Sequence, residues 1–115
     1  MNDGRSVPGM DRETAMARVG GDADLLKEIA ALFLDESEKT IAEIRTAIAA
    51  GDASSIEHAA HGLKGAVANF GAAAVVEAAQ RLEHLGRARQ LQDALSAVET
   101  LEKALDALCA ELRAL

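Results

Sequence analysis

The amino-acid sequence predicts an all-α protein, an antiparallel up-and-down four-helix bundle with a short N-terminal capping helix. Alanine and leucine dominate the 115 residues, tryptophan and tyrosine are absent, and Pro8 is the only proline. This composition favours helices and offers few residues that prefer strands. Four long segments each carry one apolar stripe at helical spacing, and short turns separate them. Such helices bury their stripes most simply against one another.

The N-terminal part is expected to contain a tail and one short helix. Residues 1–10 are polar, hold Gly and Pro and show no periodicity, so we expect a flexible tail there and one bundle domain over residues 11–115. A chain of this length is too short for two domains. Asp11 is the expected N-cap of a helix that runs to about Arg18, and the Gly20-Gly21 pair is expected to end it.

Asp22 is the expected cap of the first long helix, which we expect to run to about Ala50. The apolar residues of this segment recur at intervals of three, four or eight residues, as one face of a helix requires. They are Leu26, Ile29, Phe33, Ile41, Ile44 and Ile48. Gly51 is the expected left-handed terminator, and Asp52 can cap the helix that follows.

The other long helices are predicted from the same signals. The third should extend to about Asn69 or Phe70 and stop at Gly71. The fourth should end between residues 86 and 89, and its stripe consists of Val75, Ala79 and Leu82. The last helix has the strongest amphipathic pattern of the sequence. Its apolar residues are Leu91, Leu95, Val98, Leu101, Leu105, Leu108, Leu112 and Leu115.

The third helix is predicted to have one apolar face and one polar face that carries a histidine. At about 100° per residue, its core-facing residues fall within roughly 40° of one direction. These are Ile56, Ala60, Leu63, Val67 and Phe70. His61 falls on a second face together with Glu57, Lys64, Gly65 and Ala68. The imidazole of His61 is therefore expected to be exposed.

These residue types in this pattern suit phosphoryl transfer through a histidine. A neutral imidazole is a good nucleophile toward phosphorus, and its phosphoramidate bond is labile enough to pass the group on. Lys64, at i+3 from His61, can compensate the phosphoryl charge, and Gly65 leaves room for a partner. An acceptor must also hold the inner ring nitrogen. Glu83 is the first candidate for that acceptor and Gln80 the second, because Gln80 points further toward solvent.

The arrangement His61-x-x-Lys64-Gly65, followed by Gly71 and then by Leu82-Glu83, resembles the signature of histidine-containing phosphotransfer (HPt) domains. The resemblance covers about residues 11–115. It implies a phosphorelay module that takes a phosphoryl group from a receiver-domain aspartate and passes it to another receiver. In that family the matching histidine is phosphorylated on its outer nitrogen, the lysine contacts the phosphoryl group and the glycine leaves space.

The resemblance also assigns the remaining site residues and the partners. The family position that orients the ring is often a glutamine, and here Glu83 occupies it, which is a departure. Receiver docking is expected around the histidine, at Gly65, Ala68 and Glu57. The partners implied are response-regulator receiver domains and a hybrid histidine kinase. No cofactor is expected on this chain, and the Mg²⁺ needed for transfer would belong to the receiver.

The composition also argues against several function classes. A net charge of −7 and a pI near 4.9 disfavour nucleic-acid binding, which depends on cationic side chains. No run approaches the roughly 18 apolar residues that span a bilayer, and Met1–Met10 lacks a signal-peptide core, so we expect a soluble cytoplasmic protein. The phosphotransfer interpretation adds the expectation of a monomer. A lone Cys109 cannot form an internal disulfide. The sequence contains no Gly-rich nucleotide loop, so a kinase or another ATP-using enzyme is not expected.

Two other functions compete with the phosphotransfer interpretation. One is a non-catalytic helical adaptor that binds a receiver domain without being phosphorylated. The other is a metal-binding bundle, which needs inward-facing Glu and Glu-x-x-His pairs. The Glu57–His61 pair has neither that spacing nor that face, so no metal site is expected.

Overall fold

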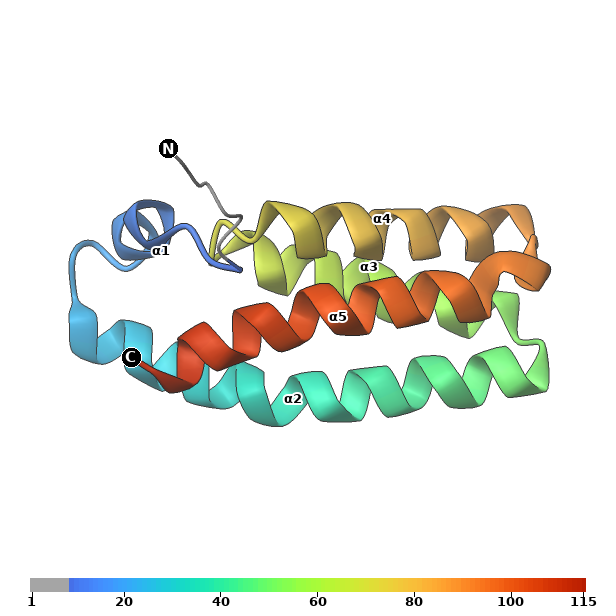
Figure 1. Ribbon diagram of the computed structural model, residues 1–115, viewed down its shortest axis with the longest axis horizontal. Helices are drawn as coiled ribbons and strands as arrows, with labels where there is room; N and C mark the ends of the chain where they lie inside the picture. Colours follow the sequence, from blue (N-terminus) through green and yellow to red (C-terminus); the bar gives the residue numbers. More distant parts are fainter. Residues whose placement is uncertain (1–8) are drawn as a thin grey trace.

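A computed structural model describes residues 9–115 of the chain, and these residues form helices joined by short turns (Figure 1). The elements are α1 (Arg12–Arg18), α2 (Ala23–Ala50), α3 (Ala53–Ala68), α4 (Ala73–Ala88), the single 3₁₀ turn η1 (Leu91–Asp93) and α5 (Ala94–Arg113). The long helices α2 to α5 lie side by side, each packed against the next, and α5 closes the bundle against α2. The predicted all-α four-helix bundle is confirmed. None of the described helices is long and apolar enough to cross a membrane.

Aspartate caps and glycine turns set the helix boundaries. Asp11, Asp22 and Asp52 precede α1, α2 and α3, and each accepts a hydrogen bond from a backbone N–H of the first turn, as predicted. Gly51 ends α2 with a φ of 67° and Gly71 follows α3 with a φ of 61°, a left-handed conformation that favours glycine. These turns reverse the chain between consecutive helices.

α1 covers the end of the bundle at which α3 turns into α4 (Figure 1). The backbone N–H of Asp11 donates to the carbonyl of Phe70 at 2.9 Å, and Arg18 donates to the side chain of Asn69 at 3.3 Å. The capping position predicted for the short helix is therefore confirmed.

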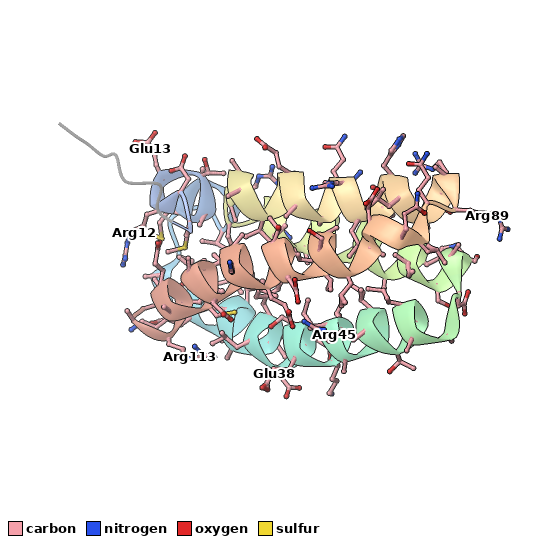
Figure 2. All side chains as sticks on the ribbon, turned by 45° about the vertical axis from the view of Figure 1, so that its right-hand side comes forward. Arg12, Glu13, Glu38, Arg45, Arg89 and Arg113 are labelled. Atoms are coloured by element: carbon pink, nitrogen blue, oxygen red, sulfur yellow. The ribbon has the colours of Figure 1, made fainter. Side chains whose placement is uncertain are left out.

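The apolar stripes form one continuous core. All five residues predicted for the core face of α3 are at most 4% exposed. Phe33 of α2 packs edge to face against Phe70, with ring centroids 5.3 Å apart, and this contact fixes the register of α2 against the end of α3. Further along α2, Arg45 lies between α2 and α5 and forms an ion pair with Glu102 (Figure 2).

The start of the last helix differs from the prediction. Leu95 was expected in its apolar stripe but is 51% exposed, while Ala94 and Ala97 are buried. The helix begins only at Ala94, after the 3₁₀ turn that contains Leu91. At about 100° per residue Leu95 then lies well to one side of the buried direction, and alanine fits the narrow space between α4 and α5.

The predicted tail lies mostly outside the described residues, which begin at Gly9. Its last two residues contact α5: the backbone N–H groups of Gly9 and Met10 donate to the carboxylate of Glu111 at 2.6 and 3.1 Å. The Met10 side chain is 5% exposed and belongs to the core. The expectation of a flexible segment therefore does not describe Gly9 and Met10.

Gly86 allows α3 and α4 to pack unusually close together. A Cβ atom at this position would lie 2.8 Å from the backbone nitrogen of Glu57 and 2.9 Å from the carbonyl oxygen of Ala53. The fourth helix was expected to end between residues 86 and 89, and α4 runs through Gly86 and ends at Ala88, as predicted. The glycine is needed for the approach of two backbones, and that approach brings the side chains of α4 against α3.

The substitution Gly86→Ala should destabilise the bundle, because its methyl group would meet backbone atoms of α3 that cannot move independently. We expect a loss of about 1–3 kcal/mol in the free energy of unfolding, as in other overpacked cores. The matched control is Gly62→Ala in α3, where a Cβ would meet nothing within 4 Å. Chemical denaturation should show that this variant gains up to about 1 kcal/mol from helix propensity. Equal effects of the two substitutions would contradict the packing described here.

Candidate functional site

The candidate site lies where the polar face of α3 meets the flank of α4. The turn at Gly71 makes α3 and α4 antiparallel, and His61 and Glu83 stand ten and twelve residues from it. The structure brings these two side chains together, with His61 Nδ1 2.8 Å from Glu83 Oε2. Gln80, the second candidate for this contact, is exposed and makes no hydrogen bond to the ring.

His61 is exposed, as predicted, while its ring-orienting partner is buried. The imidazole side chain is 68% exposed and the Glu83 side chain only 6%. Because an ionised carboxylate can only accept, a neutral His61 ring must carry its proton on Nδ1. The lone pair is then on Nε2, which has no hydrogen-bond partner within residues 9–115. In the neutral form of the ring, the site therefore presents an oriented nitrogen lone pair to solvent.

Lys64 completes the contact between α3 and α4. Its Nζ lies 2.7 Å from Glu83 Oε1, and the Lys64 side chain is 29% exposed. This hydrogen bond, with a further one from His61, lowers the pKa of Glu83 from 4.5 to about 2, although burial acts in the opposite direction. Glu83 is consequently a carboxylate at neutral pH, and it connects the histidine to the lysine.

Arg87 is a member of the site that the sequence analysis missed. Its Nη2 donates to Glu83 Oε2 at 2.9 Å, and its Nε donates to Glu57 Oε2 at 2.9 Å. The spacing of Glu83 and Arg87, four residues apart on one helix, is a signal that could have indicated the first of these contacts. The second depends on how closely α3 and α4 pack, which the sequence pattern does not reveal.

The residues predicted for partner docking differ in their exposure and in their contacts. Gly65 is exposed, and a Cβ there would meet nothing within 4 Å, so no internal packing requires a glycine. Ala68, two turns beyond His61 on the same helix, is half-buried. Glu57 is occupied by its ion pair with Arg87. Gly62, to which the sequence analysis gave no role, is also open to solvent.

The arrangement suits a nucleophilic imidazole that acquires positive charge during reaction. When Nε2 forms a bond to an electrophile while Nδ1 keeps its proton, the ring becomes cationic. The Glu83 carboxylate already lies against that proton and stabilises the charge without rearrangement. Within residues 9–115, no group of three or more His, Cys, Asp or Glu side chains is arranged to hold a metal ion.

The low pKa of Glu83 makes the stability of the fold depend on pH. A carboxylate whose pKa is lowered in the folded state contributes stability that is fully present above its unfolded value and is lost as the pH falls. For Glu83 this window extends from about 4.5 down to about 2. Denaturation of the unsubstituted chain and of Glu83→Gln should show that the stability advantage of the unsubstituted chain decreases as the pH falls through this window. A difference independent of pH between 5 and 2 would mean that Glu83 is not held as a carboxylate.

Comparisons with known proteins identify the family to which the chain belongs. The model of the Hpt domain family matches residues 28–111 of the chain. A search of curated proteins returned no match. Among solved structures, the chain is similar to the crystal structure of histidine-containing phosphotransfer protein B (HptB) from Pseudomonas aeruginosa PAO1. The two share 26% sequence identity over 94% of each chain, with a TM-score of 0.87. The chain therefore belongs to the Hpt domain family.

Proposed function

We propose that this chain accepts a phosphoryl group on Nε2 of His61 from the aspartate of one receiver domain and passes it to the aspartate of another. One observation carries the proposal: the ring is held at Nδ1 by a buried carboxylate 2.8 Å away while 68% of the side chain is exposed. A histidine that served only as a solvated surface residue would need no such partner.

The transfer step follows from the geometry of the ring. The Nε2 lone pair attacks the phosphorus of an aspartyl phosphate, the N–P bond forms, and the P–O bond to the aspartate breaks to leave a carboxylate. The ring keeps its Nδ1 proton throughout and becomes a cation paired with Glu83. The return step is the reverse on a second receiver. No proton has to move in either direction, so the role of this chain is positioning and charge compensation.

Lys64 is proposed to contact the transferred group. It lies one turn beyond His61 on α3, and its ammonium group is already within 2.7 Å of the carboxylate that holds the ring. A phosphoryl group on Nε2 would bring negative charge next to this face of the helix. A charge-assisted hydrogen bond from Lys64 would stabilise that charge.

A receiver domain is proposed to dock over the exposed face of α3 and the adjacent side of α2. Gly62 and Gly65 leave this part of α3 without side chains. On α2, Leu32 is 69% exposed and, at about 100° per residue, shares its direction with Glu43 and Ala50, which line the groove toward α3. We propose that Leu32 forms the α2 part of this docking surface.

The chain acts as a phosphoryl carrier, and its phosphate comes from receiver domains fed by a hybrid histidine kinase rather than from ATP. We place the Mg²⁺ on the receiver, because a receiver aspartate is the group that exchanges the phosphate. We also propose that the carrier works as a monomer in the cytoplasm.

The substitution His61→Gln should abolish labelling. In a screen with phosphorylated receiver domains, the unsubstituted chain should take up label that is labile to acid and stable to base, as expected for a phosphoramidate. His84→Gln, which replaces an exposed histidine of α4, is the control and should be labelled like the unsubstituted chain. Label that persists in His61→Gln would refute the site. A receiver that binds both proteins equally but labels neither would instead indicate a non-catalytic adaptor.

The substitution Lys64→Ala should slow transfer while leaving the bundle folded, because the lysine acts on the charge of the phosphoryl group and lies outside the core. We expect a rate about ten- to a hundredfold lower in single-turnover transfer from a phosphorylated receiver. Lys103→Ala, at an exposed position on α5, is the matched control. Circular dichroism should show the same helical content in both variants. Unchanged transfer in Lys64→Ala would exclude the role given to this lysine.

A further inference from the structure

Three side chains of the site, those of His61, Lys64 and Arg87, contact the same carboxylate, that of Glu83. Glu83 receives Lys64 on Oε1 and both His61 and Arg87 on Oε2. Arg87 also holds Glu57, so its guanidinium joins the two carboxylates. In the proposed transfer reaction His61, Lys64 and Glu83 each have a role, whereas Arg87 has none so far.

The proposed role of Lys64 creates a conflict at Glu83. Before transfer the ammonium group lies 2.7 Å from Glu83 Oε1, on the side of the inner ring nitrogen. After transfer the phosphoryl group is on Nε2, the outer ring nitrogen. If Lys64 moves to the phosphoryl oxygens, Glu83 loses a charge-assisted hydrogen bond while only 6% of its side chain is exposed. An uncompensated buried carboxylate is costly, so this loss would oppose transfer.

Arg87 provides the charge that remains when Lys64 leaves. Its guanidinium contacts Oε2, while Lys64 contacts Oε1, so the two cations do not compete for one oxygen. The second donor on Glu57 holds the guanidinium in place without help from Lys64. Guanidinium is also always charged and donates several hydrogen bonds in a fixed geometry.

We propose that Arg87 is a positioning residue of the transfer reaction, which keeps Glu83 in place as a carboxylate against the ring and thereby frees Lys64 to move from Glu83 to the phosphoryl group. The inference rests on the proposed function, since it concerns the same site. It assigns Arg87 an action through Glu83 alone. Removing the charge of residue 83 should therefore remove the need for the arginine.

The test compares Arg87→Gln in two backgrounds, the unsubstituted chain and Glu83→Gln. The rate measured is single-turnover transfer from the acetyl-phosphate-charged receiver domain that labels His61 fastest. We expect Arg87→Gln to slow transfer about tenfold in the unsubstituted chain and less than about twofold in the Glu83→Gln background, because the coupling of two contacting residues shows as non-additivity. Arg87→Lys should restore much of the lost rate, since it returns a positive charge to the same place.

Controls separate this role from a structural one. Thermal unfolding of each variant checks that rates are compared for folded protein. The matched control is Arg81→Gln, which replaces an exposed arginine of the same helix. Transfer from phosphoramidate, a small donor that needs no docking, should show the same dependence on Arg87. Equal losses in both backgrounds, or no loss in the unsubstituted chain, would overturn the role of Arg87 alone. Absence of label on the unsubstituted chain from every donor would overturn the proposed function, and this role with it.

Discussion

The site depends on one carboxylate, that of Glu83, which is buried and yet ionised. A carboxylate leaves water only when charged donors replace its hydration, and here His61, Lys64 and Arg87 do so. Each of these contacts also fixes the side chain that makes it. One buried charge therefore orients the imidazole of His61 and positions the ammonium group of Lys64 and the guanidinium of Arg87.

That charge is held where it is by the packing of α4 on α3. Gly86 lets the two backbones approach, and the buried Ala60 and Ala79 have side chains small enough for the same close packing. Glu83 lies one turn before Gly86 on α4, so its side chain meets the polar flank of α3 instead of solvent. Small residues in the core thus bring α3 and α4 close enough for the polar side chains at their flank to contact one another.

The sequence was sufficient to predict features that depend on periodicity and on the chain reversal at Gly71. The apolar stripes predicted the core, and the similar distances of His61 and Glu83 from that turn, ten and twelve residues, predicted their contact, because antiparallel helices pair such residues. The sequence was insufficient to predict contacts that depend on the distance between two helices. The need for a glycine at position 86 arises from the approach of α3, and the contact of Arg87 with Glu57 depends on the same approach. The burial of Met10 depends on a long-range contact with α5, which no local pattern signals.

The most direct test is the tautomer of the His61 ring, measured by ¹⁵N NMR of the imidazole nitrogens at a pH where the ring is neutral. We expect the proton on Nδ1, donated to Glu83, and an unprotonated Nε2. We also expect Glu83→Leu to remove this preference. A proton on Nε2 in the unsubstituted chain would refute the proposed transfer step, because the nitrogen that must attack phosphorus would then have no free lone pair.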